Sequence, residues 1–188
     1  MNADSLHSTF DLPRGKQRFR ELCVYISKKC ERDPSFGAVK INKILYYSDF
    51  RAFERFGQPL TGFKYVKLPQ GPAPIAMVPI RNELIGEGAI RVEHEAAGGE
   101  YTRHRWIALR APVMDHFTAD EVTLVNEVIE ELWGQSAQKV SDASHDVRWR
   151  CVNMKDPMPY ELAFLSNDPV TDDEDAVTKD LAQRFGWG

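Results

Sequence analysis

Apolar side chains near the start of the chain recur at helical spacing. Over residues 17–31 they lie three or four positions apart, which predicts a helix with one apolar stripe. The stripe consists of Phe19, Leu22, Cys23, Ile26 and Cys30. The same spacing predicts a longer helix over residues 38–56, and Gly57 and Pro59 follow it in the order typical of a helix end.

The segment after this long helix carries strand and turn signals. The first half of residues 61–72 is consistent with a short edge strand, and the second half predicts a rigid turn. The turn motif consists of Pro69, Gly71 and Pro72. Pro74 suits the first turn of another helix. Pro79 removes a hydrogen bond from a helix interior, so we expect that helix to begin late, to kink or to split there.

Two alternating segments predict a β-hairpin over residues 89–95 and 101–109, joined by a turn at Gly98-Gly99. A turn centred on these two glycines places Ile90 opposite Ile107 and Glu93 opposite His104. In this register His94 and His104 point to opposite faces of the hairpin, so they cannot share a metal ion. A register shifted by one residue would bring them together.

The C-terminal half predicts several further helices. Thr118 and Glu121 form a capping box, which predicts a helix from residue 119. Ser136 suits the cap of a short helix to about residue 145, Pro159 suits the start of one over 160–165, and residues 176–185 form a weak helical pattern. The predicted fold class is α+β and mainly α-helical, with about six helices and a small antiparallel sheet of one hairpin and a short edge strand.

The length and composition suggest one folded domain. A chain of 188 residues with 43% hydrophobic side chains can bury a core without disulfides or metals. We predict a flexible N-terminus over residues 1–17, a domain over 18–165, and an acidic C-terminal tail over 166–188.

Charge is distributed unevenly along the chain. The formal net charge is −4, and the predicted tail carries that whole excess. Residues 14–67 have thirteen basic and five acidic side chains, whereas residues 111–134 have six acidic ones and no lysine or arginine. This asymmetry predicts electrostatic pairing, either within the fold or with a partner.

The chain has no pattern typical of a membrane or secreted protein. Its longest uncharged stretch, residues 68–80, is too short to span a bilayer, and the N-terminus lacks the apolar run of a signal peptide. Three widely spaced cysteines are typical of a reducing compartment. We therefore expect a cytoplasmic protein without a membrane partner.

The candidates for catalysis are few. Cys151 follows a basic aromatic run and lies six residues after His145, but the sequence has no signature that would orient this pair. The Gly86-Glu87-Gly88 sequence does not continue as a phosphate-binding loop, and there is no cysteine and histidine cluster with metal-ligand spacing. We expect no enzyme activity, no catalytic residues, no metal site and no cofactor.

DNA binding is an alternative function. The predicted order of two helices, a strand, a helix and a hairpin is that of a winged helix, in which Arg103 and Arg105 of the hairpin would contact phosphates. The helix in the recognition position has only one basic residue, Arg81, so it offers few side chains that could contact bases in the major groove. The opposing interpretation is that the basic side chains of the long helix only solvate its outer face. These are Lys40, Lys43, Arg51 and Arg55.

Protein binding is the remaining function class. Tyr46, Tyr47 and Phe50 lie within one and a half turns of helix, so they cannot all face one core. At least one of them either lies under the turn at residues 69–72 or contacts a partner, because tyrosine is a residue type that anchors interfaces.

Several motifs occur in the order of a known family. They are Lys43-Ile44-Leu45-Tyr46-Tyr47-Ser48-Asp49-Phe50, Gly57-Gln58-Pro59-Leu60-Thr61-Gly62, the Pro69-Gln70-Gly71-Pro72 turn, Val140-Ser141 with His145 and Trp149, and Pro159-Tyr160-Glu161-Leu162. With them the chain resembles the SocA-like antitoxin family, the Panacea domain, over about residues 18–165. Pro79 departs from the family pattern, in which that position lies within an uninterrupted helix.

The resemblance implies a non-enzymatic antitoxin, from a family also found in phage-associated proteins, that binds a cognate toxin directly. A protease is a second implied partner, to which an antitoxin can deliver its toxin. Nucleic acid is the less favoured partner. An acidic surface would complement a toxin with a basic active site. The predicted partner-binding residues are Tyr46, Tyr47, Asp49, Glu127, Glu130, Glu131, His145 and Trp149.

Overall fold

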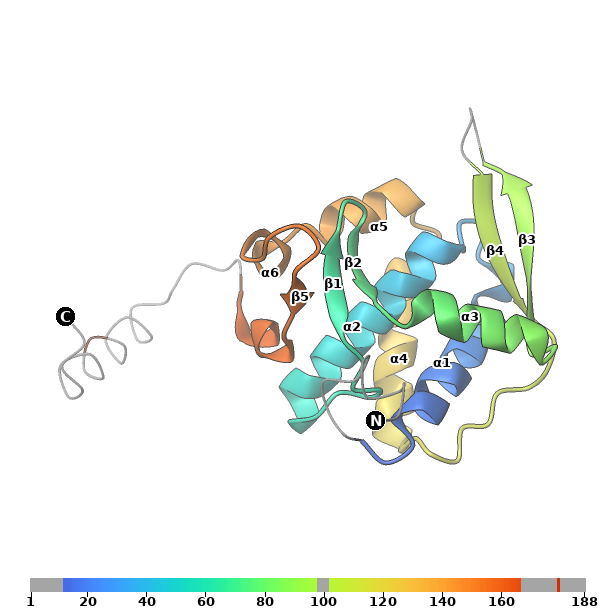
Figure 1. Ribbon diagram of the computed structural model, residues 1–188, viewed down its shortest axis with the longest axis horizontal. Coiled ribbons are helices and arrows are strands. Elements are labelled where there is room, and N and C mark those ends of the chain that lie inside the picture. The colour runs from blue at the N-terminus through green and yellow to red at the C-terminus, as the bar shows by residue number, and fades with distance from the viewer. Residues whose placement is uncertain (1–11, 98–101, 167–178, 180–188) are drawn as a thin grey trace.

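The computed structural model describes residues 12–97, 102–166 and 179 (Figure 1). Its helical elements are α1 (Gly15–Lys29), the 3-10 turn η2 (Cys30–Arg32), α2 (Ala38–Phe56), α3 (Met77–Gly86), α4 (Ala119–Leu132), α5 (Ala137–Ala143), α6 (Val147–Arg150) and the 3-10 helix η3 (Tyr160–Phe164). Its strands are β1 (Tyr65–Leu68), β2 (Gly71–Pro74), β3 (Ile90–Ala96), β4 (Thr102–Ala108) and β5 (Pro157–Met158). The predicted α+β, mainly helical fold with about six helices is confirmed.

Helix α2 lies in the middle of the molecule (Figure 1). It contacts α1, α4, α5, β2 and η3, and most of its residues are buried. The structure confirms its predicted range, because Gly57 ends it in the left-handed conformation at φ 74°. The charged side chains that such a helix buries need partners inside the fold.

Aromatic rings from distant segments form the core beside α2. The ring of Phe50 lies 4.4 Å from that of Tyr46, 5.6 Å from that of Tyr65 and 5.0 Å from that of Tyr160. The hydroxyl of Tyr160 donates to the carbonyl of Phe63 at 2.7 Å, so the last described helical element is fixed against the segment that precedes β1.

The strand predicted at an edge is the central strand of a sheet. β1 pairs antiparallel with both β2 and β5, in the order β2-β1-β5. The sequence could not reveal these partners, because β5 is only two residues long and β2 contains Pro72 and Pro74. Proline has no N–H group, and it is tolerated in β2 because that strand forms the edge.

Helix α3 begins later than a start at Pro74 would require. Pro74 belongs to β2, and the first residue of α3 is Met77. Pro79 therefore lies in the first turn, where its missing N–H breaks no intrahelical bond. Of the three expected outcomes, the late start is the one observed.

The register of the β3–β4 hairpin differs by one residue from the prediction. Ile90 pairs with Ala108, and His94 lies opposite His104 with 4.6 Å between the ring centroids. The main-chain N–H of Leu109 donates to the carbonyl of Ala89, so these two residues form a hydrogen-bonded pair. Hydrogen-bonded and non-hydrogen-bonded pairs alternate along an antiparallel ladder, which makes His94 and His104 a non-hydrogen-bonded pair. The predicted turn at Gly98-Gly99 lies outside the described residues.

The later helices agree closely with the sequence. The Thr118–Glu121 capping box is present at the start of α4, and Ser136 caps α5. α6 was not predicted; Asp146 caps it by accepting from the N–H of Trp149. Residues 160–164 form a 3-10 helix.

The predicted termini are only partly described. Of the predicted flexible segment 1–17, residues 15–17 belong to α1, and residues 1–11 lie outside the described part. The predicted helix 176–185 lies outside it apart from residue 179.

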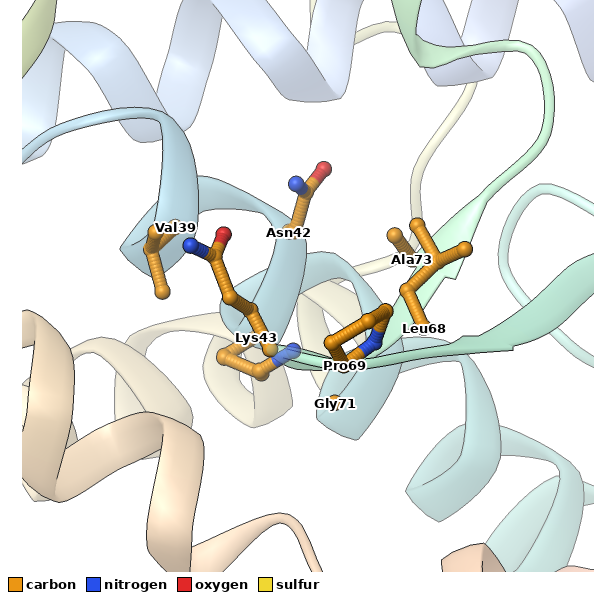
Figure 2. Close-up of a pocket in the computed structure, with 8 residues that line it drawn as sticks. Val39, Asn42, Lys43, Leu68, Pro69, Gly71 and Ala73 are labelled. Atoms are coloured by element: carbon orange, nitrogen blue, oxygen red, sulfur yellow. The ribbon is translucent and has the colours of Figure 1, made fainter. Parts of the chain in front are cut away.

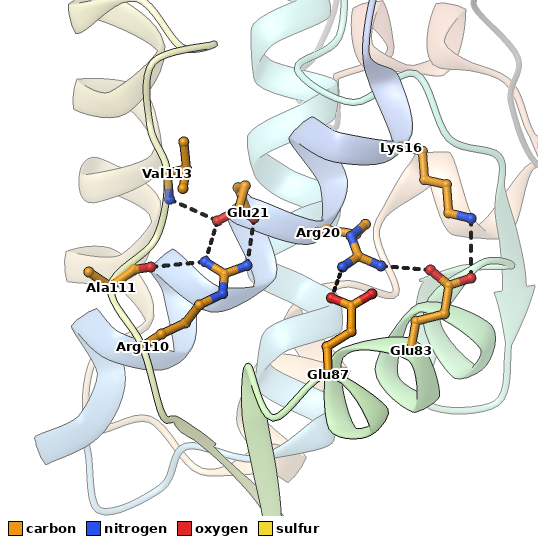
Figure 3. Close-up of polar contacts among 8 residues, drawn as sticks. All are labelled: Lys16, Arg20, Glu21, Glu83, Glu87, Arg110, Ala111 and Val113. Carbon is orange, nitrogen blue, oxygen red and sulfur yellow. Dashed lines mark hydrogen bonds and ion pairs between the residues drawn. The ribbon is translucent and has the colours of Figure 1, made fainter.

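Charged side chains join α1 to the elements around it (Figure 3). Arg20 pairs with Glu83 and Glu87 of α3, and Lys16 pairs with Glu83 at 3.2 Å. On the other side, Arg110 donates two hydrogen bonds to the buried carboxylate of Glu21, at 2.6 and 2.7 Å. Burial alone would raise the pKa of Glu21, but these bonds and one from the N–H of Val113 lower it overall.

Within the described residues, no helix is both long and apolar enough to span a bilayer.

Paired cysteines test the hairpin register. The Cα atoms of a non-hydrogen-bonded antiparallel pair lie close enough for a disulfide. In a Cys151→Ser background, we expect His94→Cys/His104→Cys to oxidise to a disulfide, detected by thiol labelling and mass spectrometry. The control Glu93→Cys/His104→Cys represents the register expected from the sequence and should stay reduced. Oxidation of the control pair alone would refute the register described here.

Candidate functional site

Asp49 of α2 holds the loop that leads into β1. One carboxylate oxygen accepts from the N–H of Thr61 at 2.8 Å, and the other accepts from the hydroxyls of Thr61 at 2.5 Å and Tyr65 at 2.8 Å. The side chain is fully buried. Burial raises the pKa of Asp49 to about 6, although the hydrogen bonds from Thr61 and Tyr65 oppose this change.

Lys43 of α2 holds the turn between β1 and β2. Its ammonium is buried and donates to the carbonyl of Pro72 at 2.8 Å. Gly71 has φ 89°, and a Cβ atom there would clash with the hydroxyl of Ser144 and the ammonium of Lys43. The turn motif therefore needs glycine both for its backbone conformation and for the space below it.

A second buried lysine, Lys40, lies one turn earlier on α2. It forms an ion pair with Asp33 at 2.7 Å, and both side chains are 1% exposed. The interpretation that Lys40 and Lys43 solvate an outer face is therefore wrong, because both point into the fold. Arg51 and Arg55, which are partly exposed, pair with acidic residues of α4.

A groove lies beside the turn, between α2 and α5. One cavity of about 230 Å³ is lined by Val39, Asn42, Lys43, Leu68, Pro69, Gln70, Gly71 and Ala73 (Figure 2). A second of about 320 Å³ is lined by Val39, Gln70, Ala137, Gln138 and Ser141. Because the two cavities share Val39 and Gln70, we treat them as one site and call it the turn groove.

Tyr46 and Asp49, predicted to bind a partner, are fully buried, and Tyr47 is 9% exposed. Their side chains offer a partner almost no surface in this conformation, and their visible role is to pack α2 against its neighbours. The guanidinium carbon of Arg51 lies 5.4 Å from the centroid of the Tyr47 ring.

The acidic residues predicted to bind a partner lie on the exposed side of α4. Glu127 pairs with Arg55 at 2.8 Å, and Glu131 pairs with Arg51 at 2.7 Å. Within the described part of the chain, no basic side chain pairs with Glu130. Much of the negative charge of α4 is therefore compensated inside the fold, one of the two outcomes that the charge asymmetry predicted.

His145 and Trp149, also predicted to bind a partner, lie together near the turn. Their rings stack at 4.0 Å, and the indole N–H donates to the carbonyl of Leu68 at 3.1 Å. The ammonium nitrogen of Lys67 lies 3.8 Å from the centroid of the Trp149 ring. Both side chains are half-buried, so this cluster mainly supports β1 from the side of α6.

A family model described as "Antitoxin SocA-like, Panacea domain" matches residues 41–150. The chain belongs to this family. The match covers more than half of the chain and includes most of α2 and every lining residue of the turn groove except Val39. Searches of curated proteins and of solved structures give no match.

The structure gives a physical reason for the motifs of the Panacea domain in this chain. Lys43 and Asp49 of the helix motif reach the two turn motifs, and each satisfies its buried charge on main-chain groups of a turn. The motifs are far apart in sequence but form one packing unit. Lys43 was not predicted from the sequence as a functional residue. The pattern that could have indicated it is a lysine three residues before Tyr46 on a helix face that is otherwise buried.

The other candidate chemistries gain no support from the described residues. Arg103 donates to the carbonyl of Pro34 at 2.5 Å, and Arg105 donates to that of Asp33 at 3.0 Å, so both hold the hairpin to the body instead of projecting toward phosphates. Cys151 is exposed, and no described hydrogen bond joins it to His145.

Substitution of Gly71 tests the support of the turn. Gly57→Ala places a Cβ at φ 74° with no atom within 4 Å, so we expect a loss of about 1 kcal/mol of unfolding free energy from backbone strain alone. Gly71→Ala adds a clash in a packed site, and we expect a further loss of roughly 2 kcal/mol. Urea unfolding measures both values; equal losses would show that the packing below Gly71 is looser than described.

Asp49→Asn tests the cost of the buried charge. The folded-state pKa of about 6 exceeds the ordinary value of 3.8, so stability from Asp49 is fully present below about pH 4 and is lost as the pH rises through 6. Asparagine does not ionise. We expect wild-type protein to lose on the order of 2–3 kcal/mol of unfolding free energy relative to Asp49→Asn between about pH 4 and pH 7. A pH-independent difference would contradict this assignment.

Proposed function

We propose that the protein is an antitoxin that neutralises a cognate toxin by binding it directly. The family match over residues 41–150 is the observation that supports this function. In this proposal the protein acts in the cytoplasm, and its effect comes from binding and not from catalysis.

The proposed mechanism is occlusion of the active site or substrate groove of the toxin. A toxin that acts on RNA or nucleotides has a basic site, which an acidic surface would complement. Since Glu127 and Glu131 are paired with arginines, the acidic side chains of residues 115–131 without a described ion partner are Asp115, Asp120 and Glu130, and the sequence after residue 165 adds six acidic and two basic residues.

Co-expression with the neighbouring open reading frame tests the function. We expect that frame to arrest growth alone and to be harmless with this chain, and the two proteins to purify as a complex. An unchanged amount of toxin in protected cells would support occlusion, whereas its disappearance would support delivery to a protease. A harmless neighbour, or a toxic one that this chain neither binds nor neutralises, would refute the proposed function.

Charge reversal of Glu130 tests the acidic surface. Because it breaks no described ion pair, Glu130→Lys should leave the thermal stability unchanged and slow association with the toxin by about tenfold at low ionic strength, measured by stopped-flow or biosensor kinetics. Glu161→Lys makes the same charge change in η3 and serves as the control. A second variant combines Glu130→Lys with deletion of residues 166–188. If it associates with the toxin as fast as wild type does, the acidic-surface mechanism is contradicted.

A further inference from the structure

The two buried lysines of α2 differ in their partners. Lys40 and Lys43 are both 1% exposed, and Lys40 is neutralised by the carboxylate of Asp33. Lys43 has the carbonyl of Pro72, and no Asp or Glu among the described residues forms an ion pair with it. A buried cation without a counter-charge is costly to fold, so its retention needs a reason.

The surroundings of Lys43 contain little negative charge. Residues 68–72 of the turn carry no ionisable side chain. At the end of α5, Asp142 accepts a hydrogen bond from Gln138 at 2.7 Å, and Asp146 at the start of α6 pairs with Arg148 at 3.2 Å. Burial accordingly lowers the pKa of Lys43 to about 7.

Lys43 also lines the turn groove, so a ligand in that groove lies against its side chain (Figure 2). A second polar atom of the groove lining lacks a partner: the side-chain oxygen of Asn42 is buried and accepts no hydrogen bond from the described residues. A ligand that brings both an anionic group and an N–H donor would satisfy both residues. An acidic peptide segment has this chemistry.

We propose that the turn groove binds a segment of the partner protein that carries a carboxylate, and that this carboxylate forms an ion pair with Lys43 while a peptide N–H of the segment donates to Asn42. The inference rests on the proposed function, because the partner is the toxin. It assigns recognition to an acidic residue or to the C-terminal carboxylate of that partner.

Addition of a partner strand to the sheet is the less favoured mode of docking beside this groove. The edge strand β2 contains Pro72 and Pro74, which offer no N–H groups to an incoming strand. The carboxylate contact therefore has to supply the anchor that main-chain pairing supplies in strand addition.

The first experiment uses acetate as the probe and needs no toxin. The pKa of Lys43 is followed by NMR of its side chain in the full-length protein, with acetate up to about 0.1 M replacing chloride at constant ionic strength. We expect acetate to raise this pKa toward that of an exposed lysine, and to leave the signals of Lys40 unchanged because Asp33 already occupies its ammonium. An identical titration of Lys43 in acetate and in chloride would overturn the proposal.

The second experiment uses two isosteric variants that leave Lys43 in place. Gln70→Glu puts a carboxylate on the rim of the cavity that contains Lys43, whereas Gln17→Glu makes the same charge change on α1, away from the lining of the turn groove. We expect Gln70→Glu to raise the pKa of Lys43 and to weaken toxin binding at least tenfold, and Gln17→Glu to change binding less than threefold. Both residues are exposed, so thermal unfolding should confirm that each variant folds.

The outcomes separate this proposal from the proposed function. A toxin that is bound and neutralised equally by wild type and Gln70→Glu would overturn the groove assignment and leave the antitoxin function intact. If the neighbouring open reading frame is not toxic, the proposed function is refuted. A response of Lys43 to acetate would then still support the anion site.

Discussion

The fold depends on burying α2 along most of its circumference. Its aliphatic and aromatic side chains form the core, but Lys40, Lys43 and Asp49 are buried with them. Because a buried charge is stable only with a partner, each of these residues fixes a segment that would otherwise be an irregular loop. Asp49 fixes the approach to β1, Lys43 the β1–β2 turn, and Lys40 the connection from α1. The polar residues of this helix thus organise its surroundings as much as the apolar ones do.

The uneven charge of the chain is largely resolved between elements. The basic N-terminal third meets the acidic helix α4 through Arg18 with Glu121, Arg51 with Glu131, and Arg55 with Glu127. The last two pairs are partly exposed, and each such pair typically contributes less than about 1 kcal/mol. Their main consequence is to set the orientation of α4 on α2 and to reduce the charge that α4 presents to other molecules. A strongly charged stretch of sequence is therefore a poor guide to an interface when its complement lies elsewhere in the same chain.

A groove next to a structural turn suits the proposed binding of a toxin. Lys43 fixes the turn and Ser136 caps α5, so the groove is formed before a ligand enters, and a preformed site loses less conformational entropy on binding. The proposed anchor requires one carboxylate, so it leaves most of the partner sequence free to vary.

The sequence by itself determined the local features: the range of α2, the left-handed end at Gly57, the capping box of α4, the mainly helical class and the family. These depend on side-chain spacing and on caps formed by residues within a few positions of one another. Only the tertiary structure decided that Tyr65–Leu68 is a central strand, that His94 faces His104, and that Lys43 and Asp49 are buried and face the turns. Each of these depends on a contact between residues distant in the chain, such as β1 with β5 or Lys43 with Pro72. Local patterns contain no information on which distant group satisfies a buried charge or an open strand edge, and that choice creates the candidate site.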